Sequence, residues 1–441
     1  MKKSFYIILI VVSICSYNEL YPQKILTLDD AITMALNQNT NVVKSTNSIA
    51  SFQAGVKSAY GNLLPNLSLG GRFGWQRVTN SEPQTLLDSL GNVLTSGSTQ
   101  YDSRNWSVSA GGNVTLFDGL ANIAEINQSK SNLESAKLTL EKLKQDVTLQ
   151  TITYYTQIIS SKELLDFQTA NLKYNEELLA QIKEKYNLKI VAITDVYSQE
   201  AQTATSKVSY LQAKNNLEIA KVNLLTYLSL DVSQDYTFDS TFTIIKDTSL
   251  YNSSPGNLFE FALQNRQDYQ SLVYQQQAAQ NQLTIARGGF FPTLSGNYGF
   301  STSASDPSNL FTQKSYSLGL SLNIPIFSNW NTENAVENAT VGVENTNEDL
   351  SALERSIKSE VKTALLNLQT AKQQADAANA ALEAARESWN IETETYKLSA
   401  ATYIDLQLAY NNYLQAQYNK INNDYSYLIA YYSLLNSLGK Y

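Results

Sequence analysis

The chain is 441 residues long and carries 32 Lys and Arg against 40 Asp and Glu, which gives a formal net charge of −8. This balance excludes the basic face with which nucleic-acid-binding proteins displace counterions. Because the sequence contains no histidine, it excludes Ser–His and Cys–His nucleophile pairs and disfavours zinc and non-haem iron sites, so we expect no metal, and only enzymes that use carboxylates alone remain open.

Residues 1–23 are predicted to be a secretory signal peptide. Two lysines precede an apolar run at residues 5–14, and this order is typical of an export signal. The run is shorter than the roughly 20 apolar residues that span a bilayer. Lipidation of Cys15, the one cysteine, is the alternative to cleavage. We therefore expect an exported protein whose mature chain is free of cysteine.

The mature chain is predicted to contain one structural plan twice. Residues 24–230 form the first repeat and residues 257–441 the second, joined by a linker at 231–256 that is rich in Asp, Ser and Thr. Landmarks of the first repeat recur 227 or 210 residues later, as in the pairs Ala35 with Ala262 and Phe117 with Phe327. The first copy has a longer connection between its strands, which explains the two offsets. Two halves on one plan indicate a duplication.

Each repeat is predicted to contain one pair of membrane-spanning strands, in which apolar residues alternate with small or polar ones. The four runs are 66–76, 105–116, 293–301 and 315–325. Alternation over about ten residues fits a strand with one lipid face and one aqueous face, and a half-buried strand of a soluble sandwich is the alternative. Four strands are too few to close a membrane barrel, and open edges in lipid leave backbone groups unpaired. The membrane interpretation therefore requires an oligomer.

The rest of each repeat is predicted to be helical, with a short helix before the strands and a long hairpin after them, at 119–230 and 329–438. The stretches 119–186 and 329–396 contain no proline, and each could extend roughly 100 Å as a helix. Apolar residues recur every three or four positions, which predicts coiled-coil packing. Helices this long are taller than a membrane and must project into solution.

Short sequences occur in a constant order along the mature chain. They are Leu26-Thr27-Leu28-Asp29-Asp30-Ala31, Leu64-Pro65, Phe117-Asp118-Gly119, Val191-Ala192-Ile193-Thr194-Asp195-Val196, Phe291-Pro292 and Pro325-Ile326-Phe327. With the repeated order of helix, strand pair and long helical hairpin, they resemble the TolC-type outer-membrane efflux proteins of Gram-negative bacteria, the outer membrane factors. The resemblance covers essentially the whole mature chain.

The resemblance implies a mainly α-helical fold with membrane β-structure. A homotrimer would contribute four strands per chain to one twelve-stranded barrel in outer-membrane lipid, and the hairpins would form a coiled-coil tunnel in the periplasm. It also implies a passive exit duct of a tripartite efflux or type I secretion system, with a periplasmic adaptor (membrane fusion) protein and an inner-membrane pump as partners. No enzymatic activity, cofactor or nucleic acid is expected.

The resemblance further implies a gate at the turns of the hairpins. Asp195 and Asp405 match aspartates that ring the constriction, and Tyr186 and Tyr396 match a tyrosine position beside the turn. Six carboxylates per trimer around a narrow pore would attract cations. Capping of a helix N-terminus is the alternative role for either aspartate.

The adaptor is expected to contact the tips at Lys189, Ile190, Ser399 and Ala400. Lys189 and Ser399 stand where the family usually has glycine, and a left-handed turn residue other than glycine would be strained there. The arginine with which some members lock the closed tip is replaced by Ala401. We therefore expect a less tightly latched entrance.

Two other classes of protein compete with the duct. A structural or adhesive surface protein would use the helices as a stalk without transport, but Ser, Thr, Asn and Gly on one face of the strands suit a water-filled pore. A carboxylate-only hydrolase would need two acids in a cleft, roughly 5 to 10 Å apart. The sequence indicates no such pair outside the repeat pattern.

Overall fold

The computed structural model describes residues 25–80, 84–87, 90, 93–96, 99–239, 254–398 and 400–440. The predicted signal peptide, residues 240–253 of the predicted linker and Ser399 lie outside the described residues. The chain divides into two compact units. The first unit comprises Met1–Thr46, Leu140–Gln267 and Glu354–Tyr441, and the second comprises Asn47–Thr139 and Asp268–Leu353. Each unit therefore takes segments from both halves of the chain.

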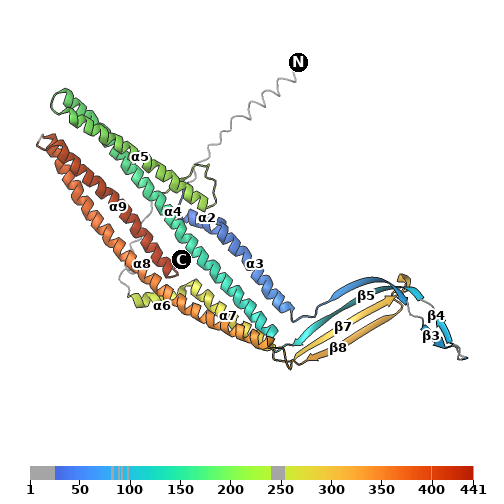
Figure 1. The fold of residues 1–441 in the computed structure, drawn as a ribbon. Helices are drawn as coiled ribbons and strands as arrows, with labels where there is room; N and C mark the ends of the chain where they lie inside the picture. The colour runs from blue at the N-terminus through green and yellow to red at the C-terminus, as the bar shows by residue number, and fades with distance from the viewer. Residues whose placement is uncertain are drawn as a thin grey trace, which may run out of the picture. The chain divides into compact units, whose positions relative to one another are not determined.

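The described α-helices occur as two series of matching lengths (Figure 1). They are α2 (Leu28–Gln38) and α6 (Pro255–Asn265) with 11 residues, α3 (Thr40–Gly61) and α7 (Gln267–Gly288) with 22, α4 (Ala121–Asn187) and α8 (Asn331–Lys397) with 67, and α5 (Ile193–Tyr227) and α9 (Tyr403–Ser437) with 35. The repeat boundaries themselves stay a prediction, but the recurrence of four lengths is what a duplicated plan produces.

In the first unit, α4 with α5 and α8 with α9 form two helical hairpins (Figure 1). Both turns close in the same way: the amide of Ile190 donates to the carbonyl of Lys185 and the amide of Ala400 to that of Thr395, each at 2.9 Å. Lys189 has the left-handed φ of 61° that this closure needs. A lysine there costs about 1–2 kcal/mol of strain that a glycine would avoid.

A stripe of buried apolar side chains runs along α8, with one at every third or fourth residue. They are Ile357, Val361, Leu365, Leu368, Ala371, Ala375, Ala378 and Leu382. A stripe of this spacing is the seam of a coiled coil. The expected coiled-coil pattern is confirmed for this helix.

A short parallel strand pair, which the sequence analysis did not predict, joins β1 (Ile25–Leu26) to β6 (Thr237–Phe238) in the first unit. The hydroxyl of Tyr155 on α4 fastens this pair, because it donates to the carbonyl oxygens of Leu26 at 3.0 Å and Asp239 at 2.8 Å. Burial raises the pKa of Tyr155 to about 12. The start of the described chain is thus anchored to the middle of a long helix.

The second unit contains an antiparallel sheet of four strands in the order β2-β5-β7-β8. The strands are β2 (Ser68–Asn80), β5 (Thr99–Phe117), β7 (Thr293–Ala304) and β8 (Lys314–Asn323). Each of the four expected runs overlaps one of these strands, although β2 begins and β8 ends two residues inside the expected bounds, and the first pair extends further toward its connection than expected. A short 3₁₀-helix, η1 (Pro307–Asn309), precedes β8, and a further hairpin, β3 (Gln84–Leu87) with β4 (Val93–Ser96), was not predicted.

At each strand-to-helix junction of the second unit, two successive residues have a left-handed backbone conformation, with positive φ. Gly119 and Leu120 have φ of 69° and 71° before α4, and Asn329 and Trp330 have 53° and 59° before α8. A Cβ on Gly119 would lie only 2.7 Å from the Cβ of Phe291. Glycine is therefore required at the first junction by both the backbone angle and the space.

Among the helices described here, none is both long and apolar enough to cross a membrane.

Candidate functional site

The register of the four-stranded sheet gathers its apolar side chains on one face. In β7 and β8, Leu294 is paired with Leu322, Tyr298 with Leu318 and Phe300 with Tyr316. The opposite face receives small and polar pairs such as Ser295 with Ser321. On β8 the apolar side chains lie open to solvent, and Leu318 is 89% exposed. A sheet face of this kind is unstable in water and needs an apolar surrounding.

Pairs of aromatic rings lie in the strands toward their loops and just beyond β8 at the strand-to-helix end, and we call these two groups the aromatic rows. Toward the strand loops, Phe73 lies 4.3 Å from Trp106 and Phe300 lies 5.3 Å from Tyr316, measured between ring centroids. At the strand-to-helix end, the exposed rings of Phe327 and Trp330 lie 5.2 Å apart. Aromatic rows on both sides of an apolar band are typical of strands that cross an outer membrane.

The height of the band fits a bilayer. β8 has 10 residues. Ten residues extend about 33 Å along the strand, and a tilt of about 40° reduces this to about 25 Å across the membrane. β2 and β8 are the edges of the sheet.

The tips of the two hairpins pack together in the first unit through a small apolar cluster. Leu178 and Ile182 of α4, Val196 of α5 and Tyr403 of α9 are its buried members. Tyr396 of α8 packs against them. All four long helices therefore meet near the turns, where the sequence analysis expected the gate.

Of the expected gate residues, Asp195 and Tyr396 are brought close together. Burial and then the negative charge of Asp195 raise the pKa of Tyr396. The ring of Tyr396 also lies 4.2 Å from the Lys185 ammonium, a cation–π contact. Its buried hydroxyl has no hydrogen-bond partner among the described residues. Lys185 was missed by the sequence analysis, because only the folded tip shows which lysine of α4 faces α8.

The two aspartates that were expected at the gate have different surroundings. The Asp405 carboxylate accepts hydrogen bonds from the Thr402 hydroxyl at 2.6 Å and the Thr402 amide at 3.1 Å, and the Thr402 hydroxyl accepts from the Asp405 amide at 3.2 Å. This capping box starts α9. These hydrogen bonds hold the pKa of Asp405 below its usual value. At the equivalent start of α5 the cap is Ala192, which supplies no side-chain hydrogen bond to Asp195.

The remaining expected tip residues are open to solvent. Tyr186, Lys189, Ile190 and Ala400 are all exposed. Ser399 lies outside the described residues. Tyr186 is thus unlike its equivalent Tyr396, which is half-buried against Lys185.

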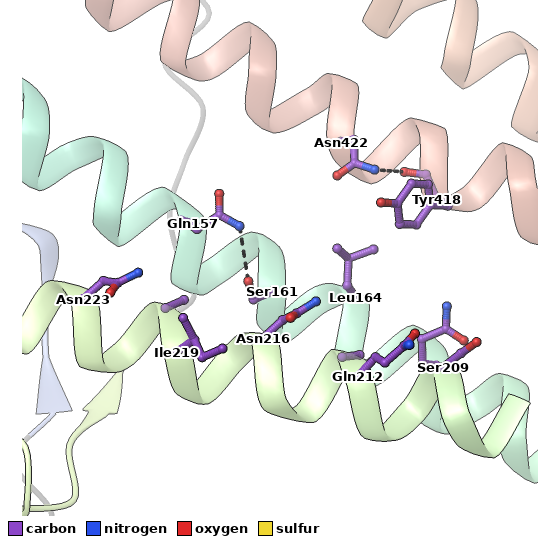
Figure 2. Close-up of a pocket in the computed structure, with 13 residues that line it drawn as sticks. Gln157, Ser161, Leu164, Ser209, Gln212, Asn216, Ile219, Asn223, Tyr418 and Asn422 are labelled. Carbon is purple, nitrogen blue, oxygen red and sulfur yellow. Dashed lines mark hydrogen bonds between the residues drawn. The ribbon is translucent and has the colours of Figure 1, made fainter.

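A polar groove of about 550 Å³ lies on α4, α5 and α9, away from the tips (Figure 2). Its walls carry amide and hydroxyl groups but no charged side chain. Gln157 and Ser161 come from α4, Asn216 and Asn223 from α5, and Asn422 from α9. The Gln157 amide donates to the Ser161 hydroxyl at 3.3 Å. None of the expected gate or tip residues lines this groove.

Comparison with known proteins agrees with this architecture. The family model described as outer membrane efflux protein matches residues 31–229 and 258–440. The chain is 23% identical over 400 residues to the outer membrane protein TolC of Escherichia coli strain K12, which covers 87% of this chain and 76% of that protein. It is 22% identical over 303 residues to the pyoverdine export outer membrane protein OpmQ of Pseudomonas aeruginosa, covering 68% of this chain and 61% of that protein.

A solved structure shares the fold at low sequence identity. The Campylobacter jejuni CmeC outer membrane channel superposes with a TM-score of 0.80 at 18% identity, covering 94% of this chain and 85% of CmeC. These relatives give no support to a stalk without transport. The chain belongs to the outer membrane efflux protein family, whose members are exit ducts of the Gram-negative outer membrane with a helical tunnel in the periplasm.

Proposed function

We propose that this family member is a passive homotrimeric duct whose periplasmic entrance is gated at the tips of the helical hairpins. The observation that carries the proposal is the exposed apolar sheet face between two aromatic rows, on a chain whose other half is long helical hairpins. The sheet suits lipid, whereas the polar surface of the hairpins suits water.

The trimer follows from the edges of the sheet. A four-stranded sheet in lipid leaves the backbone groups of β2 and β8 unpaired, at a cost of several kcal/mol for each group. Pairing of β2 with β8 of a neighbouring chain removes this cost, and three chains close a barrel of twelve strands.

The proposed gate consists of Asp195, Asp405, Tyr186 and Tyr396. The carboxylates of Asp195 and Asp405 from three chains would surround the pore and favour cations. Asp405 also takes part in the capping box of α9, so in this proposal one residue serves both as a helix cap and as a gate carboxylate. The cluster around Tyr396 supports a closed arrangement, because it packs both hairpins against each other.

The proposed partners are a periplasmic adaptor protein and an inner-membrane pump, of a tripartite efflux or type I secretion system. Lys189, Ile190, Ser399 and Ala400 are the proposed adaptor contacts. Exposure of Ile190 supports this role, because an apolar side chain at 64% exposure on a helical tip is available to a partner.

Cysteine cross-linking tests the trimer. The chain has no cysteine beyond Cys15 in the predicted signal peptide. We expect one new cysteine on β2 and one on β8 to give, after oxidation, a covalent species of three chains and none larger. When the cysteine variant assembles together with cysteine-free chains, oxidation should give covalent products of fewer than three chains. Cross-links that continue past three chains, or none for any pair of positions along the two strands, would contradict the closed trimer.

A further inference from the structure

A group of aromatic and amide side chains ties the two hairpins of the first unit together, starting at Tyr403 of the tip cluster and extending away from the turns. We call it the aromatic–amide clasp, and its members are Asn171, Tyr174 and Asn175 of α4, Gln199 of α5, Trp389 of α8, and Tyr403, Tyr410 and Tyr413 of α9. Asn175 and Asn171 stand 12 and 16 residues before Asn187, the last residue of α4. That is about 18–24 Å along the helix.

The polar half of the clasp is a continuous chain of hydrogen bonds. The Tyr403 hydroxyl donates to the Gln199 side-chain oxygen at 2.6 Å, and the Gln199 amide donates to the Asn175 side-chain oxygen at 3.0 Å. Asn175 in turn donates to the Asn171 side-chain oxygen at 2.8 Å, which also accepts from the Tyr410 hydroxyl at 2.9 Å. Both ends of the chain are on α9, and its middle is on α5 and α4.

The aromatic half of the clasp joins α8 to the same place. Trp389 stacks on Tyr413 at 4.8 Å with an interplanar angle of 17°. The ring of Tyr410 lies 5.2 Å from Trp389 and 4.2 Å from Tyr174. Contacts of this kind contribute beyond the area they bury, and here they connect α4, α8 and α9, while α5 joins through the hydrogen bonds of Gln199.

The clasp shares Tyr403 with the apolar cluster at the tip and adds hydrogen bonds between the hairpins. At the tip, the contacts between hairpins are the apolar cluster and the Lys185–Tyr396 contact. Among the described residues, the bond from Tyr403 to Gln199 is the hydrogen bond between hairpins nearest to the turns. Gln199 is 0% exposed, so parting the hairpins would deprive its buried side-chain oxygen of the Tyr403 hydroxyl until water entered, and the Tyr410 hydroxyl would lose Asn171.

We propose that the aromatic–amide clasp is the latch of the entrance. In this arrangement Tyr403 and Tyr410 are positioning residues: they hold the second hairpin against the first, and the tips part only when both hydroxyls release their amide acceptors. This inference rests on the proposed function. Our expectation of a less tightly latched entrance considered only Ala401 at the turn and stays a prediction beside this one.

Single-channel recording of the purified full-length protein in planar bilayers tests the latch. Tyr403→Phe and Tyr410→Phe keep both rings and remove the two hydroxyls. We expect the double variant to raise the ratio of open to closed time by about ten-fold or more, because the two hydrogen bonds between the hairpins are lost, whereas the bond from Gln407 to Tyr403 lies within α9. Tyr418→Phe is the matched control, since Tyr418 is on the same helix, 45% exposed and outside the clasp, and its record should equal that of the wild type.

Trp389 supplies a second measurement that does not depend on conduction. Acrylamide quenching of its fluorescence, with Trp389→Phe as the blank, should increase in the double variant and stay unchanged in Tyr418→Phe. If the double variant does not fold, Tyr413→Leu replaces it in both measurements. This substitution removes the ring stacked on Trp389 and leaves the hydrogen bonds of the clasp in place. We expect it to raise both the quenching and the open time.

The outcomes separate the latch from the duct. A conducting wild type whose variants conduct identically overturns the latch alone, whether or not the quenching of Trp389 changes. Silence of the folded wild type and of every folded variant contradicts the proposed duct, and the latch with it. Longer opening in the variants, with an unchanged Tyr418→Phe record, supports both.

Discussion

At the scale of single residues, Asp195 and Asp405, the two aspartates of the proposed gate, occupy equivalent places and differ through one neighbour. Asp405 shares a capping box with Thr402, whereas the place of Thr402 at the start of α5 is taken by Ala192. A cap satisfies amides that the first turn of a helix leaves free. The start of α9 is therefore better fixed than that of α5, although both lie beside the proposed gate.

Exchanging the caps tests this difference. Thr402→Val should destabilise the first turn of α9 by about 1 kcal/mol, and Ala192→Thr should stabilise that of α5 by a similar amount, because it builds a capping box with Asp195. Amide hydrogen exchange followed by mass spectrometry measures both changes. An exchange rate that rises about five-fold in one turn and falls in the other is expected. Unchanged exchange in both would show that the caps do not hold these turns.

The cap of α9 should also weaken in acid. Because hydrogen bonds from Thr402 lower the pKa of Asp405 in the folded chain, its carboxylate stabilises the fold fully above the unfolded pKa. That contribution is lost as the pH falls through the lower, folded value. We expect protection of the first turn of α9, corrected for intrinsic exchange, to decline in this acidic range in the wild type. Thr402→Val should show little decline, and an equal decline in both proteins would refute the assignment.

At the scale of elements, the junctions between strands and helices limit which residues the chain accepts. Gly119 combines a left-handed backbone with contact against Phe291 and the carbonyl of Gly288. By contrast, Gly342 on α8 has no atom within 4 Å of the place where a Cβ would stand. The two glycines thus form a natural comparison within the second unit.

Alanine substitution should separate them. Gly119→Ala should destabilise the protein by about 2–5 kcal/mol, from backbone strain and overpacking together. Gly342→Ala should leave stability unchanged or raise it by up to about 1 kcal/mol, since alanine favours helix. The thermal midpoint of the detergent-extracted protein measures both. If the Gly119→Ala protein has the same thermal midpoint as the wild type, the junction relaxes without a loss of stability, and the prediction is wrong.

The elements that the sequence predicted are those with a local period. The apolar positions Tyr316, Leu318, Leu320 and Leu322 alternate with small or polar ones and mark β8. The apolar stripe from Val361 to Leu382 marks α8. Both patterns are set by residues close together in the chain. The pairing of β1 with β6 and the bond from Tyr403 to Gln199 join residues about 200 apart, and no local period encodes them. The positions of Asp195 and Asp405 were predictable from family motifs, but their different hydrogen bonds depended on Ala192 and Thr402.

At the scale of the whole molecule, one chain contains a surface that is stable in an apolar environment and a surface that is stable in water. The sheet exposes an apolar face between aromatic rows, and the helices bury a narrow stripe and leave polar residues outside. Membership of the outer membrane efflux protein family assigns the first surface to lipid and the second to the periplasm. In our proposal, the chain forms a pore whose entrance carries the carboxylates of Asp195 and Asp405.

The ionic selectivity of single channels in a planar bilayer tests that claim most directly. We predict discrete openings of the wild-type protein that prefer cations, and loss of this preference in the Asp195→Asn and Asp405→Asn double variant, because neutral amides replace the carboxylates at the entrance. Equal selectivity of the double variant and the wild type would contradict the placement of the gate. Absence of any current from the folded trimer would contradict the pore itself.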